Sequence, residues 1–186
     1  GDVIFTTFLI GAVKRAWPEA VIHMLVAPRG EAIVRHHPQV TRVWVYDKRA
    51  GQKSLGSLRR MACDLQHEQF DLILNAHPSA RSRLITRLIG AKVSVGYEGF
   101  GSRFCFTHVV SNDLAVEPDH VERRINLLRV LRPEAGAEPL NVGLAPEAVE
   151  WADSFLQANG ASGSPLLGVI CGSAWRTKRW SESGFA

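Results

Sequence analysis

The chain has 186 residues, enough for one full domain and part of a second. Hydrophobic residues make up 46% and charged residues 22%, an ordinary balance for a globular protein that argues against disorder. The uncharged apolar runs fall short of the roughly 20 residues that span a bilayer. A net charge of +4 favours anionic partners without choosing among phosphates, nucleic acid and membrane surfaces.

Apolar periodicity predicts helices and strands that alternate along the chain. We expect helices at 2–16, 30–36, 55–65, 82–90, 118–132 and 146–159, and strands at 20–27, 41–47, 71–76, 92–97, 102–110 and 165–172. Most of the strands are nearly continuous apolar runs, which favours a parallel sheet with helices on both faces. The predicted fold class is therefore α/β, of the Rossmann-like, doubly wound type.

A stretch rich in Gly and Ser at 157–165 predicts a domain boundary. We expect an N-terminal Rossmann-like domain over residues 1–160 and the beginning of a second over 161–186. The chain opens with a helix, whereas a doubly wound domain has a strand there, at the centre of its sheet. Two inner strands would then lack a partner, so we expect a fragment of a longer protein.

The cysteines Cys63, Cys105 and Cys171 are far apart and form no CxxC pair. Cys63 and Cys171 lie in apolar segments, which predicts buried free thiols. Free thiols are typical of a reducing compartment, so we expect the protein to be cytoplasmic.

Asp2 would stand at the carboxyl edge of the sheet, at the start of the first helix. Ligands bind at this edge in open α/β sheets, and a carboxylate there can act as a general base toward a hydroxyl group. Asp is also a favoured N-cap residue that suits the helix dipole. Both interpretations stay open on the residues alone.

The stretch "GSAWRTKRW" follows the last predicted strand and combines donors for an anion. Ser173 and Thr177 supply hydroxyl groups, Lys178 supplies a point charge, and Ser181 would cap the next helix. These groups fit a phosphate or diphosphate, although the stretch lacks both GxxxxGK[ST] and GxGxxG. The alternative is a basic surface loop with Trp180 packed in the core.

The stretch "AHPSARSRLITR" follows strand 71–76 at the same edge. His77, Arg81 and Arg83 would reach an anionic substrate there, because guanidinium groups recognise carboxylates and phosphates. A solvated helix face explains these arginines equally well.

Other chemistries leave no trace in the sequence. There is no GxSxG or HExxH motif, and the histidines lack the spacing of a metal site. Aromatic residues do not alternate with a basic stripe, as the binding of single-stranded nucleic acid would require. We expect no cofactor, no metal and no nucleic-acid partner.

Five ordered segments resemble glycosyltransferase family 9, the ADP-heptose:lipopolysaccharide heptosyltransferases. They are "GDVIFTTFLIGAVKRAWPEAVIHMLV", "HPQVTRVWVYD", "FDLILNAHPSARSRLITRLIGAKVSVGY", "HVERRINLLRVL" and "GVICGSAWRTKRWSESGFA". The resemblance implies a GT-B fold, in which two Rossmann-like domains face each other across a cleft. It also implies inverting, metal-independent transfer of a heptose from ADP-heptose to the inner core of lipopolysaccharide.

The family's pattern also implies roles for individual residues. Asp2 falls on the proposed base, Lys178 on the lysine that stabilises the leaving diphosphate, and Ser173 near the phosphates. Ala174 stands where some relatives carry a second hydroxyl, and Ser181 where a Pro often follows the family's Trp. The implied partners are ADP-heptose, an anionic lipid-linked saccharide and, peripherally, the inner face of the inner membrane.

Two alternatives remain. One is a GT-B glycosyltransferase with another donor or acceptor. The other is a non-catalytic truncated remnant, because a chain without most of its donor domain should not turn over; we expect this fragment alone to be inactive. A Rossmann-type dinucleotide enzyme lacks its fingerprint here.

Overall fold

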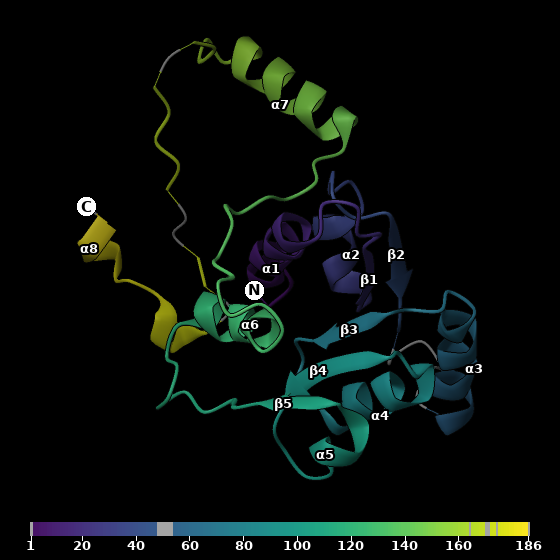
Figure 1. Ribbon diagram of the computed structural model, residues 1–186. Coiled ribbons are helices and arrows are strands. Elements are labelled where there is room, and N and C mark those ends of the chain that lie inside the picture. Colours follow the sequence, from purple (N-terminus) through teal and green to yellow (C-terminus); the bar gives the residue numbers. More distant parts are fainter. Residues whose placement is uncertain (1, 48–53, 164, 170–171, 174, 186) are drawn as a thin grey trace. The chain divides into compact units, whose positions relative to one another are not determined.

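The structure is a computed structural model that describes residues 2–47, 54–163, 165–169, 172–173 and 175–185 (Figure 1). It forms two compact units, residues 1–144 and 145–186. The helix at 146–159, which the sequence analysis assigned to the first domain, belongs to the second unit. The boundary between two Rossmann-like domains at residue 160 stays a prediction.

The first unit alternates helices and strands, as predicted. Its helices are α1 (Asp2–Ala16), α2 (Pro28–Val34), α3 (Leu55–Gln66), α4 (Ala80–Ile89), α5 (Ser102–Cys105) and α6 (His120–Arg129). Its strands are β1 (His23–Val26), β2 (Arg42–Val45), β3 (Leu72–Asn75), β4 (Val93–Tyr97) and β5 (His108–Val110). Among the described residues, no helix combines the length and apolar character needed to cross a bilayer.

All strand pairs are parallel and fall into two hydrogen-bonded groups. β1 pairs with β2, with Cα partners from His23–Arg42 to Val26–Val45. The order of the other group is β3-β4-β5. Within the described residues, β1 bonds only β2 and β3 bonds only β4, so each keeps one edge without a bonded strand.

Helices cover both faces of the β3-β4-β5 group because its side chains alternate between them. Val95 and Tyr97 of β4 pack on one face with Leu9 of α1 and Ile125 of α6. On the other face, Asn75 of β3 donates a hydrogen bond to Thr86 of α4. The predicted layering of a doubly wound sheet is therefore confirmed in this unit (Figure 1).

The predicted strand at 102–110 is wrong in its first half. Ser102–Cys105 is the short helix α5, and only His108–Val110 is a strand. Gly101 precedes the helix with a φ of +74°, a conformation that turns the chain sharply. The ring of Phe106 then packs against Gly96 and is buried, and β5 begins two residues later at His108.

Two further predictions are corrected. Residues 165–169 have no regular structure, and Leu167 is 90% exposed, so no strand forms in the described part of 165–172. A parallel strand needs a neighbour, and the described residues of the second unit offer none.

The predicted burial of Cys63 is wrong. Cys63 is exposed because it follows Ala62 on α3, and Ala62 faces the core while Cys63 faces solvent. Cys171 lies outside the described residues.

The second unit contains the helix α7 (Pro146–Ala158), the 3₁₀ turn η1 (Arg176–Lys178) and the short helix α8 (Glu182–Phe185). On α7 the rings of Trp151 and Phe155 stack with centroids 5.4 Å apart and remain largely exposed. The unit is thus held by local contacts among its described residues.

The close packing of β4 on Phe106 gives a test of the fold. A Cβ added at Gly96 would overlap Cζ of the Phe106 ring, so Gly96→Ala should lower the free energy of unfolding by about 1–3 kcal/mol. Urea unfolding of the intact protein measures this loss. Gly136→Ala is the matched control, because a Cβ there meets nothing within 4 Å. Phe106→Leu should recover part of the loss in the Gly96→Ala background. Equal stabilities of the two alanine variants would contradict the packing.

Candidate active site

The candidate site lies at the carboxyl edge of the parallel strands. β3 ends at Asn75 and β4 at Tyr97, so the segments that follow both strands emerge at this edge. Asp2 is the first residue of α1, as predicted. Its side chain lies outside the described part of the structure.

The predicted acceptor-binding residues all lie at the start of α4. Ser79 caps this helix: its hydroxyl accepts from the N–H of Ser82 at 3.1 Å, within a capping box. His77 is exposed in the loop before the cap, and its N–H donates to Oδ1 of Asn75 at 3.1 Å. Arg81 lies in the first turn, and Arg83 follows two residues later.

The two arginines point to different strand ends. Nη1 of Arg81 donates to the hydroxyl of Tyr46, just beyond β2, at 3.0 Å. A Cβ added at Gly99, just beyond β4, would lie 2.8 Å from Nη1 of Arg83, so this guanidinium lies against the Gly99 backbone. Arg81 and Arg83 therefore spread positive charge along the edge from β2 to the loop after β4.

Sequence reasoning missed Asn75 and Tyr46. The buried Asn75 ends β3, donates to Oγ1 of Thr86 at 2.9 Å and accepts from the N–H of His77. Tyr46 is 6% exposed and holds Arg81. A polar residue that ends an apolar strand, such as Asn75 in "DLILNA", is the signal that could have revealed it.

Arg124 is a third residue that sequence reasoning missed. Its side chain is buried, Nη1 donates to the carbonyl of His120 at 2.8 Å, and Cζ lies 5.5 Å from the ring centroid of Phe5. The ring of His120 stacks on Phe5 at 5.7 Å. Because Phe5 follows Asp2 by three residues, a buried cation lies against the first turns of α1. The spacing of Arg124 from Val121 and Leu128 would have predicted its buried position.

The start of α6 and the end of β4 are fixed by polar contacts. The N–H groups of Glu122 and Val121 donate to Asp119, and these bonds hold the pKa of the Asp119 carboxyl below its usual range. The Tyr97 hydroxyl donates to the carbonyl of Arg123 at 3.0 Å. Burial raises the pKa of the Tyr97 phenol, which keeps it neutral and able to donate.

The predicted phosphate-binding residues lie together in the second unit. Thr177 and Lys178 belong to η1 and are exposed. The N–H of Lys178 donates to the carbonyl of Trp175 at 3.0 Å, and Nε of Arg179 donates to the carbonyl of Ser173 at 2.8 Å. The loop from Ser173 to Arg179 is thus closed by its own hydrogen bonds.

Of the two predictions for the residues after this loop, the serine cap is confirmed and the buried tryptophan is wrong. The Ser181 hydroxyl accepts from the N–H of Gly184 at 3.1 Å, the bond of a serine that caps α8. Trp180 is 66% exposed and its ring lies against Gly184, so it is not packed in a core. No group of three or more metal-ligating side chains occurs within the described ranges.

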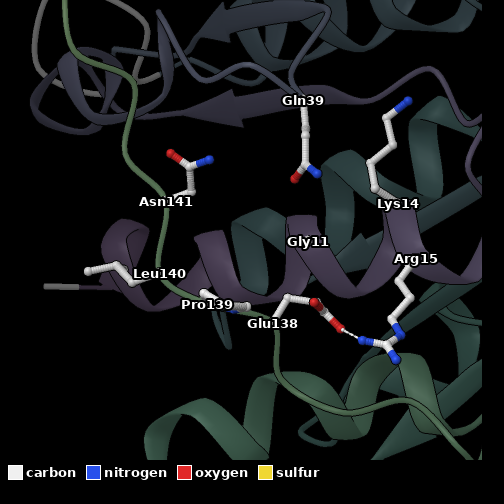
Figure 2. A pocket seen from close by; sticks show the side chains of 8 residues that line it. All are labelled: Gly11, Lys14, Arg15, Gln39, Glu138, Pro139, Leu140 and Asn141. Atoms are coloured by element: carbon white, nitrogen blue, oxygen red, sulfur yellow. Dashed lines mark hydrogen bonds and ion pairs between the residues drawn. The ribbon is translucent and has the colours of Figure 1, made fainter.

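A separate pocket of about 380 Å³ lies at the last turns of α1, beside segment 138–141 (Figure 2). Lys14 and Arg15 border it, and Arg15 pairs with Glu138 at 2.7 Å. Gly11, the lining residue of α1 nearest to Asp2 in sequence, follows it by nine residues, about 13 Å along the helix axis. None of the site residues predicted from the sequence lines the pocket.

The chain matches the sequence profile of glycosyltransferase family 9 (heptosyltransferase) over residues 58–186. It is 27% identical to lipopolysaccharide heptosyltransferase 1 of Pseudomonas aeruginosa, over 98% of this chain and 52% of that protein. It is 26% identical to lipopolysaccharide heptosyltransferase 3 of Escherichia coli, over 59% of this chain and 34% of that protein.

Solved structures show the same fold. The crystal structure of the glycosyltransferase family 9 protein from Veillonella parvula matches with a TM-score of 0.87 and 24% identity, over 99% of this chain and 54% of that one. ADP-heptose lps heptosyltransferase II of E. coli matches with a TM-score of 0.62 and 18% identity, over 86% and 47%.

The chain spans about half the length of lipopolysaccharide heptosyltransferase 1 and of these two structures. The family profile covers most of the chain, and the α/β architecture agrees with that of the family's solved structures. The chain belongs to glycosyltransferase family 9.

Proposed function

We propose that the protein carrying this chain transfers a heptose from ADP-heptose to the inner core of lipopolysaccharide, with inversion and without a metal in the chemistry. The observation that supports this most is the family match over residues 58–186. The relatives named heptosyltransferases add to it. The anionic saccharide acceptor suits the arginines at the carboxyl edge.

Asp2 is the general base of this proposal. An acceptor hydroxyl loses its proton to the Asp2 carboxylate while its oxygen forms a bond to the anomeric carbon of the heptose. The N-terminus of α1 favours a carboxylate at this position, because the helix dipole is positive there. The buried guanidinium of Arg124, against Phe5, adds positive charge beside the first turns of α1.

Lys178, Ser173 and Thr177 stabilise the leaving group. The bond between the anomeric carbon and the diphosphate oxygen breaks with both electrons going to oxygen, so ADP gains negative charge. An ammonium group and hydroxyl donors interact more strongly with this developing charge than with the bound donor. Thr177 and Lys178 are exposed on this self-closed loop and Ser173 is half-buried, which leaves the two exposed side chains accessible to a diphosphate.

The acceptor is held by His77, Arg81 and Arg83. The Tyr46 hydroxyl positions Arg81, and Asn75 positions the backbone at His77. Because the acceptor is lipid-linked, we place the protein in the cytoplasm, peripherally on the inner face of the inner membrane. This location is part of the same proposal.

The chemical roles are tested by Asp2→Asn and Lys178→Met in the intact protein. Asp2→Asn should lower kcat about 10²–10⁴-fold, because the acceptor hydroxyl loses its base. Lys178→Met should lower kcat about 10²–10³-fold through weaker stabilisation of the leaving diphosphate. Transfer from ADP-heptose to a core saccharide is the measurement. Asp64→Asn, on the exposed side of α3, and Lys14→Met, in the last turn of α1, are the controls. Wild-type turnover in both site variants would overturn the assignment.

The acceptor contacts are tested by Arg81→Met and Arg83→Met. Each should raise KM for the phosphorylated acceptor about 10-fold, the effect of losing about 1.4 kcal/mol of binding free energy. KM for ADP-heptose and kcat should stay near wild type. Arg35→Met, at the end of α2, removes an exposed arginine away from this edge and serves as control. An unchanged acceptor KM in both variants would leave the arginines as a solvated helix face.

A further inference from the structure

Two phenylalanines between β4 and β5 are highly exposed to solvent. Phe100 is 100% exposed and Phe104, on α5, is 85% exposed. The same loop buries Phe106, which is 6% exposed against Gly96. The loop thus places one ring in the core and holds two outside, although water is an unfavourable environment for a phenylalanine ring. Large apolar side chains gathered on a surface mark an interaction site.

Positive charge accompanies the two rings. Arg103 lies between them in sequence and is exposed, and the Arg83 guanidinium lies against the backbone of Gly99, directly before Phe100. The acidic residue of the loop, Glu98, is engaged: its Oε1 accepts from Ser111 Oγ at 2.9 Å and from the N–H of Asn112 at 3.3 Å. The surface around Phe100 and Phe104 is therefore aromatic and cationic.

This surface lies at the edge where the substrate must approach. α5 follows β4 at its carboxyl end and contacts α4, whose first turn carries Arg81 (Figure 1). A lipid-linked acceptor has to be taken from a bilayer at this edge. Rings beside arginines match the interface of an anionic bilayer, where apolar groups enter the acyl boundary and guanidinium groups meet phosphates.

We propose that the β4–β5 loop is the membrane-contacting element, with Phe100 and Phe104 inserted into the interface of an anionic bilayer and Arg103 and Arg83 at its phosphates. The choice of a lipid surface rests on the proposed function, which supplies the lipid-linked acceptor. The complementarity between the exposed arginine of the loop and anionic lipid phosphates is independent of that function.

The test is co-sedimentation of the intact protein with vesicles, without any donor. Vesicles of phosphatidylcholine with phosphatidylglycerol should bind the protein, and high salt should weaken this binding. The double variant Phe100→Ser/Phe104→Ser should lower the partition coefficient about 10-fold or more, because two inserted rings are lost. Arg103→Gln should lower it several-fold on these vesicles and leave the weak binding to pure phosphatidylcholine unchanged. Leu55→Ser, at a residue 72% exposed on α3, is the matched control and should bind as wild type.

Several results would overturn the proposal. They are absence of vesicle binding in the wild type, wild-type binding by the double variant, and an equal loss in Leu55→Ser. A shift from dimer to monomer in the double variant, seen by analytical ultracentrifugation without vesicle binding, would assign the surface to a second copy. Transfer to a deacylated, water-soluble acceptor separates this proposal from the proposed function. The double variant should retain that transfer. If the proposed function is wrong, neither the wild type nor the variant transfers a heptose to the soluble acceptor, while the wild type still binds vesicles.

Discussion

The packing of α6 on α1 is the contact on which the candidate site depends. Ile125 and Leu128 of α6 are fully buried, and they share one core with Leu9 and Ala12 of α1. The small side chain of Ala12 leaves room for the neighbouring elements, and Gly11 lies so close to Glu138 that a Cβ there would be 2.6 Å from its Cβ. α1 is thus held from two sides, and its first turn, which carries Asp2, is fixed relative to β4.

The packing of α6 on α1 also explains how the charged side chain of Arg124 is kept in the interior. A buried guanidinium is costly unless its donors and its face are satisfied. The His120 carbonyl and the ring of Phe5 meet this requirement for Arg124 in part, because Nη1 and the face of the guanidinium are engaged whereas Nε is buried without a hydrogen bond. Asp119 caps the helix that presents Arg124, so the cap, the buried charge and the start of α1 form one unit. The apolar core around Arg124 holds its guanidinium in place. The positive charge of this group can favour an anion near the first turns of α1.

The sequence predicted most of the first unit because its strands are buried and its helices are amphipathic. The apolar run "DLILNA" became β3, and the helix expected at 2–16 became α1 with the same bounds. The segment at 102–110 failed because alternating apolar residues suit a strand and a helical turn alike. There the left-handed Gly101 and the burial of Phe106 decided the outcome. Arg124 was missed because a charged side chain usually indicates an exposed position, whereas its spacing from Leu128 lies on the buried side of α6.

In the second unit, segment 165–169 would need partners distant in sequence to form a strand, whereas the loop at 173–179 is closed by local hydrogen bonds. The segment at 165–169 has the composition of a buried strand, yet Leu166 and Leu167 are exposed, because a strand is stabilised by partners distant in sequence. The loop that follows needs none: Arg179 bonds Ser173, and Lys178 bonds Trp175. The geometry around Lys178 is therefore encoded within seven consecutive residues, 173–179. A short loop closed by its own hydrogen bonds keeps its donors in place without a paired strand beside it, which is why its local geometry forms here although segment 165–169 has no regular structure.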